Sequence, residues 1–434
     1  MKFARKVYIK LRNLNGLQSV NPYKISIFLL KSQYWNNDKM ASYQINSFNK
    51  LIVSAKKLPF YNERYSKINS NLDIEEITHL PITNKDDFQS NQQNFILDNI
   101  DKGFAHASSG STGKPTKIYI STKAEAFRRA SVMRFRSWWG LKLEDKLINF
   151  TAYPRSTNTL IEKIKDYLNP KLDIYIFSIS QENIFSIYNK IKKYKPKYFR
   201  GYVSSIKQLG ILLKENNLDA KLFKLKVIIV TAEILYDSDR KIIEEIFDCK
   251  IANEYGCAEQ GFIAYECPEG GMHMQEEMIL SFTNENDEII STELNNDLSP
   301  LINYKIGDRI TMSDEKCNCG RNLKLVKRIE GRIGSDDILK PDGSKMNYLF
   351  FDKMIKNMSN TELWGTIKRF QVIQKGNDCN IYLVKGDNYS DSVSNYIIEY
   401  VKTGISKDIK VNINFENDIK LEKSGKYRIF KRLE

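Results

Sequence analysis

The chain has 434 residues with a formal net charge of +14, and its 41% of hydrophobic residues can build a sizeable core for two or three domains. No apolar run approaches the length of a membrane span, and the basic start of the chain has no secretory signal, so we expect a cytoplasmic protein. Because no nucleic-acid motif accompanies the charge, it favours an anionic small-molecule substrate, or a peripheral contact with the inner face of an acidic membrane, over nucleic acid.

Residues 1–65 are predicted to form a basic helical arm, because apolar residues recur at helical spacing up to Leu58. From residue 124 onward, helical and strand-like segments alternate, which favours an α/β fold with mostly parallel sheets. The expected segments are helix 124–140, strands 146–151 and 173–177, helix 181–193, strand 198–202, helix 204–216 and the buried strand 227–230. We therefore expect a large N-terminal domain at 1–333, built of several subdomains.

After Gly343 the pattern becomes that of a smaller α+β region. The expected segments are helix 350–357, strands 369–374 and 379–385, helix 390–403 and strand 409–415. These segments predict a separate C-terminal domain at 334–434.

Ahead of the alternating segments lies a stretch rich in glycine and hydroxyl side chains, followed by the strand-like run 117–121. Glycine lets the backbone turn successive N–H groups inward, and hydroxyls and a lysine add donors, so the stretch is typical of a phosphate-binding loop. It is not a Walker A motif, because Pro115 follows the lysine where that motif has a hydroxyl residue and a helix. A flexible surface linker is the alternative. The candidate ATP-binding residues are Ser108, Ser109, Gly110, Ser111, Thr112, Gly113 and Lys114.

Several short motifs follow in the chain. Ala232 and Glu233 come directly after the buried strand, at the edge where ligands of open α/β sheets bind. Tyr255, Gly256 and Glu259 combine an aromatic face, a turn and a carboxylate that could hold Mg²⁺. Each motif alone is more often an ordinary turn or a solvated charged face. The remaining motifs contain Asp308, Arg332, Asp336 and Lys426.

A second, separable constellation is made of cysteine and histidine. Three thiols and one imidazole stand in two glycine- and proline-containing stretches, which is the donor set of a closed structural zinc site. Unligated thiols are the alternative, and the remaining cysteines at 249, 257 and 379 are expected to be packing residues. Cys257 lies inside the Tyr255–Glu259 motif and is also expected to line the wall of the site. The candidate zinc ligands are Cys267, His273, Cys317 and Cys319.

Taken in order, the motifs resemble those of the adenylate-forming (AMP-binding, acyl-CoA synthetase) superfamily. The resemblance is strongest to its phenylacetate–CoA-ligase-like branch, which includes capsular polysaccharide biosynthesis proteins. It covers residues 45–430, and the stretch 106–116 is its most specific part. It implies a large adenylation domain and a small, mobile C-terminal domain. One departure is Ala258, where many relatives have a hydroxyl residue beside the acid.

The resemblance also implies a role for each residue. The stretch 108–114, with Ala232 and Glu233, would bind ATP, and Tyr255 with Gly256 would contact the adenine. Asp308 would hold the ribose hydroxyls, and Asp336 would mark the hinge between the domains. The candidates for catalysis are the magnesium ligand Glu259, the ribose-contacting Arg332 and the lysine of the tail motif, Lys426.

The hypothesis that follows is an ATP- and Mg²⁺-dependent ligase that activates a carboxylic acid as its acyl-adenylate. The acceptor is expected to be an amine, an amino sugar or an amino acid, in surface or capsular polysaccharide biosynthesis. The alternative is an aryl- or acyl-CoA ligase, in which the thiol of CoA accepts the acyl group. A third interpretation, prompted by Ala258, is a nucleotide-binding protein without catalysis.

Overall fold

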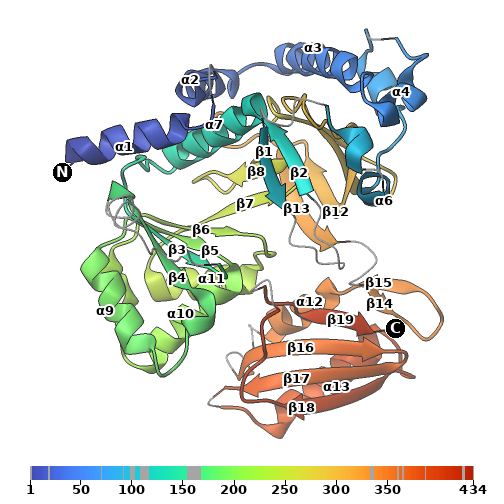
Figure 1. The fold of residues 1–434 in the computed structure, drawn as a ribbon. Helices are drawn as coiled ribbons and strands as arrows, with labels where there is room; N and C mark the ends of the chain where they lie inside the picture. The colour runs from blue at the N-terminus through green and yellow to red at the C-terminus, as the bar shows by residue number, and fades with distance from the viewer. Residues whose placement is uncertain are drawn as a thin grey trace.

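The computed structural model describes residues 2–17, 20–69, 71–90, 92–97, 103–107, 117–153, 168–332, 337–358, 361–363, 366–386, 388–422 and 426–433. N-terminal helices lie along one side of a large mixed sheet, and a smaller sheet with its own helices follows at the C-terminal end (Figure 1). The expected α/β fold class is confirmed.

Helices fill the chain ahead of the first strand. Their starts are set in part by capping side chains: the Glu76 N–H donates to Asp73 and the Asp73 N–H donates to Glu76, each at 2.9 Å. Among the described helices, none is long and apolar enough to cross a membrane. The helices are α1 (Lys2–Leu14), α2 (Pro22–Ser32), α3 (Asn37–Ala55), α4 (Pro59–Tyr65), α5 (Ile74–Thr78), α6 (Lys85–Ser90) and the 3₁₀ turn η1 (Gln92–Phe95).

An antiparallel hairpin leads into the long helix α7 (Thr122–Trp138). The hairpin consists of β1 (Gly103–Ala107) and β2 (Lys117–Ser121), which the stretch 108–116 connects in the chain. The hydroxyl of Ser121 accepts from the N–H of Ala124 at 3.2 Å, so the last residue of β2 caps the helix. The strand therefore passes into the helix without a loop.

The large sheet has, within the described residues, 11 strands in the order β10-β11-β12-β13-β9-β8-β7-β6-β5-β3-β4. Its parallel part consists of β3 (Leu147–Thr151), β4 (Lys171–Tyr175), β5 (Tyr198–Gly201), β6 (Val227–Thr231) and β7 (Ile251–Cys257). The four aliphatic residues of β6 have no exposed surface, as expected for a strand covered on both faces. Helices and 3₁₀ turns between these strands are η3 (Ile176–Ser178), α9 (Ile184–Tyr194), α10 (Val203–Glu215), η4 (Ala220–Phe223) and α11 (Asp237–Phe247).

The other half of the sheet is antiparallel, so the sheet is more mixed than the alternating segments indicated. Its strand β11 is fully buried although most of its residues are polar; Glu288, Ser291 and Glu293 are 5%, 0% and 2% exposed. Hydrophobic periodicity does not reveal such strands, because their polar groups are satisfied by partners from elsewhere in the chain. The strands are β8 (Gly261–Glu266), β9 (Met272–Met274), β10 (Ile279–Thr283), β11 (Glu288–Glu293), β12 (Tyr304–Ser313) and β13 (Leu325–Arg332).

The C-terminal domain, residues 337–433 as described, has a four-stranded sheet in the order β18-β17-β16-β19. The central pair is antiparallel and both outer pairs are parallel. Its buried residues, among them Phe351, Val372 and Ile397, form a hydrophobic cluster of their own. The elements are β14 (Asp337–Leu339), β15 (Lys345–Asn347), α12 (Leu349–Met358), β16 (Ile367–Lys375), β17 (Asp378–Lys385), α13 (Asp391–Gly404), β18 (Lys410–Phe415) and β19 (Phe430–Leu433).

A fully buried ion pair fastens the N-terminal helices to the sheet. Arg134 of α7 and Glu277, in the chain between β9 and β10, are both 0% exposed, and two nitrogen–oxygen contacts of 2.7 and 3.0 Å join them. Arg134 also donates to the carbonyl of Leu29 at 3.0 Å, and the hydroxyl of Ser32 donates to Glu277. Because charges buried without a partner are costly, α2, α7 and this part of the sheet are expected to unfold together.

Replacement of one partner tests this expectation. Glu277→Gln leaves the Arg134 charge buried without a counter-ion, so the unfolding free energy should fall by about 3–5 kcal/mol. Arg64→Ala is the control, because its 3.4 Å pair with Asp87 is partly exposed and should be worth less than about 1 kcal/mol. Urea unfolding of both variants measures the difference, and equal losses would contradict the role of the buried pair.

Candidate functional site

A cleft of about 1150 Å³ lies between the large sheet and the C-terminal domain, and residues from both line it. Part of its wall follows the carboxyl ends of β6 and β7, where ligands of open α/β sheets bind. Cys257 contributes to the wall, as expected from the sequence. Of the residues predicted from the sequence, the cleft brings together Ala232, Glu233, Tyr255, Gly256, Glu259, Asp308 and Lys426.

Two candidate nucleotide contacts, Tyr255 and Asp308, are joined directly. The hydroxyl of Tyr255, on β7, donates to the Asp308 carboxylate, on β12, at 3.0 Å. In the adjacent strand β13, the backbone of Arg332 lies opposite Asp308 in the register. An aromatic ring and a carboxylate therefore lie side by side in the wall of the cleft.

Arg128 of α7 holds the turn that carries Glu259 through a hydrogen bond to its backbone. Arg128 forms a two-pronged ion pair with Glu293, at 2.8 and 2.7 Å, and donates to the carbonyl of Glu259 at 3.0 Å. Gly256 is required here, because a Cβ atom on it would lie 2.3 Å from the carbonyl oxygen of Gly261. The glycine after Tyr255 is therefore needed for steric reasons, because no larger residue fits against the Gly261 carbonyl.

The turn after β6 has an unusual backbone. Ala232 has φ of +66°, a conformation that costs free energy for a residue with a Cβ atom and is concentrated at functional sites. The next residue, Glu233, accepts from the Ser204 hydroxyl at 2.9 Å and the Ser204 N–H at 2.8 Å. Burial raises the pKa of Glu233 to about 7, and its hydrogen-bond donors act against that shift. The carboxylate is therefore already engaged by protein donors.

One of those donors belongs to the C-terminal tail. The backbone N–H of Tyr427, next to Lys426, donates to Glu233 at 2.7 Å. The Tyr427 hydroxyl hydrogen-bonds to the backbone of Phe370 in β16, whose N–H lies 3.1 Å away. Sequence reasoning missed Tyr427, Ser204 and Arg128, because partners of a motif that lie far away in the chain leave no local signal.

Some predicted residues cannot be placed. The phosphate-loop candidates at 108–114 and the hinge candidate Asp336 lie outside the described residues. For Arg332 the backbone in β13 is described and the side chain is not.

The chain is similar to known proteins along most of its length. Residues 338–432 match the family described as the CapK C-terminal domain. The chain is 26% identical to protein CapK of Staphylococcus aureus over 64% of each chain, and 24% identical to phenylacetate–coenzyme A ligase of Thermus thermophilus over 61% of this chain and 62% of that one. Indoleacetate–lysine synthetase of Pseudomonas savastanoi is 24% identical over 57% of this chain. The matched regions span 64%, 62% and 65% of these relatives' own lengths.

The fold agrees with a solved ligase. The structure of 2-hydroxyisobutyryl-CoA ligase in the postadenylation state aligns over 93% of this chain and 91% of that one, with a TM-score of 0.75 and 15% identity. The chain fits the phenylacetate–CoA-ligase-like branch of the adenylate-forming proteins. The same ligase in its thioesterification state aligns over 93% of this chain and 92% of that one, at 16% identity, with a lower TM-score of 0.61.

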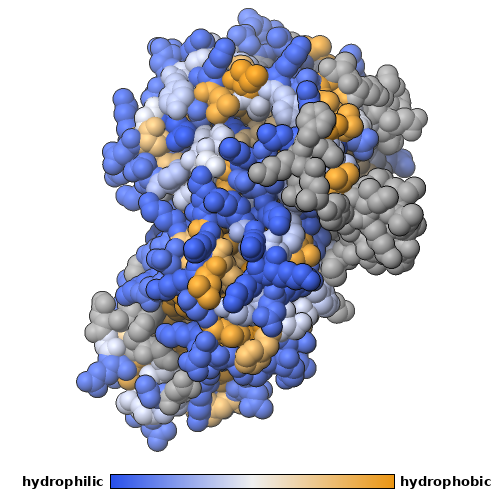
Figure 2. Space-filling model, turned by 90° about the vertical axis from the view of Figure 1, so that its left-hand side faces the viewer, coloured by the Kyte–Doolittle hydropathy of each residue, from blue (hydrophilic) through white to orange (hydrophobic). Residues whose placement is uncertain are grey.

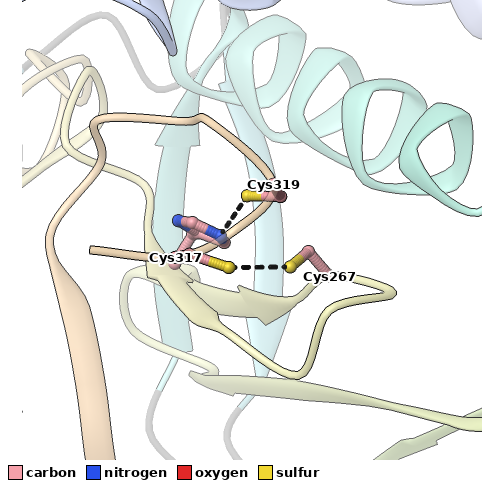
Figure 3. Close-up of side chains that lie close together, drawn as sticks. Cys267, Cys317 and Cys319 are labelled. Atoms are coloured by element: carbon pink, nitrogen blue, oxygen red, sulfur yellow. Dashed lines mark hydrogen bonds between the residues drawn. The ribbon is translucent and has the colours of Figure 1, made fainter. Parts of the chain in front are cut away.

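The chain also carries the predicted cysteine–histidine cluster, at the end of the β12–β13 hairpin away from Asp308. Its four ligand atoms lie within 4.8 Å of one another. The sulfur atoms of Cys267 and Cys317 are 3.5 Å apart, and that of Cys319 lies 3.2 Å from Nε2 of His273 (Figure 3). The structure therefore brings all four predicted ligands together.

The spacing suits a tetrahedral metal site. Zinc–sulfur bonds of about 2.3 Å would place two sulfur atoms roughly 3.8 Å apart, close to the separation seen. Burial lowers the pKa of His273 to about 4, so its ring is neutral near pH 7, the form that binds metals. Gly271 leaves room for the cluster, since a Cβ atom there would lie 2.6 Å from the Cys317 sulfur.

Proposed function

We propose that this chain is an ATP-dependent ligase that activates a carboxylic acid as its acyl-adenylate and passes the acyl group to an acceptor. The observation that carries the proposal is the convergence of Tyr255, Asp308 and Lys426 on one cleft from distant parts of the chain. Relatives in the same branch bear the names of ligases that join a carboxylic acid to coenzyme A or to lysine.

In the proposed reaction, a carboxylate oxygen of the acid attacks the α-phosphorus of ATP, the bond to the bridging oxygen breaks, and pyrophosphate leaves. The protein contributes positioning and charge, because little else is needed for transfer at phosphorus. Tyr255 offers its ring to the adenine, and Asp308 accepts hydrogen bonds from the ribose. The ammonium group of Lys426 stabilises the negative charge that develops around the α-phosphate.

The remaining nucleotide contacts are assigned by the motif order. The loop at 108–114 binds the β- and γ-phosphates through its N–H groups and Lys114, and Arg332 contacts the ribose. Glu259 would hold Mg²⁺, which when bound neutralises phosphate charge; the support is that this residue lines the cleft and that carboxylate oxygen is a preferred ligand of the ion. Asp336 is the hinge about which the C-terminal domain moves.

The acceptor that we propose is an amine, an amino sugar or an amino acid, in surface polysaccharide biosynthesis. The support is the match of residues 338–432 to the CapK C-terminal domain and the relative named for joining indoleacetate to lysine. Coenzyme A is the second candidate, because another relative and the ligase of similar fold are named for CoA thioesters. The two differ in the nucleophile, nitrogen or sulfur, that attacks the adenylate carbonyl and displaces AMP.

The cysteine–histidine cluster is proposed to be a structural zinc site. Three thiolates and one imidazole complete a tetrahedron, so no position remains for a water or substrate. Burial raises the pKa of Cys267 to about 12 when no cation is considered, and a divalent ion would supply the charge that stabilises the thiolate. The site would clamp the 317–319 loop to β9 and to the end of β8.

The N-terminal helices are proposed to contact the acidic inner face of a membrane. Residues 1–37 contain no Asp or Glu and carry Lys2, Arg5, Lys6, Lys10, Arg12, Lys24 and Lys31. On α1, Val7 and Leu11 are 41% and 63% exposed, one turn apart. This side of the molecule is largely hydrophilic with separate hydrophobic areas (Figure 2). Exposed apolar side chains flanked by cations are the combination that binds an anionic lipid surface.

The ligase proposal predicts pyrophosphate–ATP exchange that depends on a carboxylic acid. A panel containing phenylacetate, indoleacetate and 2-hydroxyisobutyrate is the first screen. Lys426→Ala should lower the exchange rate by about 10²–10³-fold with little change in ATP affinity, because its charge acts in the transition state. Lys420→Ala, an exposed lysine of the same region, is the control and should leave the rate unchanged.

Product analysis completes this experiment. CoA, lysine and glucosamine are added separately to the preformed adenylate, and the product is identified by mass. An amide supports the proposed acceptor, whereas a CoA thioester supports the second candidate. ATP binding without exchange for any acid would instead favour a nucleotide-binding protein without catalysis.

The zinc proposal predicts about one zinc ion per chain in the purified protein by elemental analysis. Cys317→Ser should abolish zinc binding and lower the melting temperature, because metal binding contributes to folding free energy. Cys249→Ser is the control, since this buried thiol lies outside the cluster and its variant should keep the metal. A metal-free wild type would refute the site.

The membrane proposal predicts that the protein sediments with vesicles containing an anionic phospholipid, and that added salt weakens the binding. The double variant Val7→Asp and Leu11→Asp should bind several-fold less. Leu222→Asp, at a 51% exposed position elsewhere, is the control. Equal binding by all three proteins, or self-association that the double variant abolishes, would contradict the proposal.

A further inference from the structure

Tyr427 belongs to both halves of the molecule at once. Its side chain is fixed to the C-terminal domain, because its hydroxyl hydrogen-bonds to the backbone of Phe370 in β16. The neighbouring residue is fixed there too, since the side chain of Gln371 donates to the Arg428 carbonyl at 2.8 Å. Its backbone N–H points the other way and donates to Glu233, which follows β6 of the large sheet. One residue therefore bridges the cleft.

On the side of the large sheet, Glu233 accepts several short hydrogen bonds. Glu233 accepts from Tyr427 at 2.7 Å while Ser204, at the start of α10, holds both of its carboxylate oxygens. Because burial raises the pKa of Glu233 to about 7, this bond is strongest above neutral pH, where the acceptor is charged. The bond from Tyr427 is therefore suited to holding the two parts of the protein together.

A second contact joins the same two domains. Lys368 of β16 forms a 2.6 Å ion pair with Glu215 at the end of α10, and both side chains are about one-third exposed. Exposed pairs of this kind contribute little to stability. This pair provides a matched comparison, because it also joins a carboxylate of the large domain to the C-terminal domain.

The arrangement of the two domains agrees with one state of a related catalytic cycle. The 2-hydroxyisobutyryl-CoA ligase aligns over 93% of this chain in its postadenylation and thioesterification states, yet the TM-score is 0.75 for the first and 0.61 for the second. Since the coverage is equal, the difference reflects how the parts are placed. This supports an arrangement of the present chain that corresponds to the first half-reaction.

We propose that Glu233 is a positioning residue that latches the C-terminal tail through the Tyr427 N–H and so holds Lys426 in the cleft for adenylation. Breaking this hydrogen bond is the event that frees the tail for acyl transfer. The inference rests on the proposed function for the role of Lys426, but the latch itself is a property of the protein alone. Glu233 thus acts on the reaction through its neighbour and does not touch the reacting atoms.

Hydrogen–deuterium exchange of the full-length protein, with fragmentation to resolve the Tyr427 amide, tests the latch without any substrate. Glu233→Ala removes the acceptor, so this amide should exchange roughly 10- to 100-fold faster. Glu215→Ala breaks the other interdomain contact and should leave the amide protected. Unchanged protection in Glu233→Ala, or equal loss in both variants, would overturn the latch.

Two further measurements separate positioning from a loss of structure. If Glu233→Ala does not fold, Glu233→Gln serves instead, because it keeps the shape and weakens the acceptor, and faster hydrogen exchange at the Tyr427 amide is again expected.

With an acid that supports pyrophosphate–ATP exchange, Glu233→Ala should lower the adenylation rate constant about 10-fold or more while the KM for ATP stays within about two-fold. A rise in KM alone would mean that Glu233 binds ATP directly. Failure of the wild type in the acid screen would reject the ligase and leave the amide result standing.

Discussion

The ion pair between Arg128 and Glu293 is the interaction on which the candidate site depends. It is nearly buried, with side chains 12% and 3% exposed, and it brings α7 under the turn that carries Glu259. Removing one member of such a pair leaves an uncompensated charge, at a cost of about 3–5 kcal/mol. The backbone of Glu259, at the cleft, is therefore held by a helix that begins directly after the β1–β2 hairpin.

Much of the fold could be predicted from sequence where one signal dominates. The strand at 227–230 is a run of aliphatic residues, and the C-terminal segments alternate with the expected periods, so their positions agree with the structure within two residues. The antiparallel half of the sheet could not be found in this way. Its strand β11 is polar yet buried, because partners such as Arg128 satisfy its Glu293, and a pairing over that distance in the chain leaves no periodic pattern.

In the candidate site, too, residues in short motifs could be predicted and their distant partners could not. Tyr255, Asp308 and Lys426 could be proposed because their motifs are short and ordered, and the cleft brings them together. The contacts that position them could not. Ser204 follows a different strand from Glu233, and Tyr427 has no distinguishing neighbours apart from the lysine. Motifs identify the groups that meet a ligand, whereas the groups that hold them in place depend on tertiary structure.

The hairpin of β12 and β13 takes part in the cleft at one end and in the cysteine–histidine cluster at the other. Asp308 lines the cleft, opposite the backbone of Arg332 in the register, and the loop between the strands carries Cys317 and Cys319 of the cluster. Successive side chains in a strand point to opposite faces, so deleting one residue of β12 between Asp308 and the loop would turn Asp308 away from the cleft or pull the loop out of the cluster. Length changes in this hairpin must therefore come as matched pairs of residues, whereas the hydrogen bonds of the turn at 284–287 are to Glu288 and Ile310, so a change there alters neither site directly.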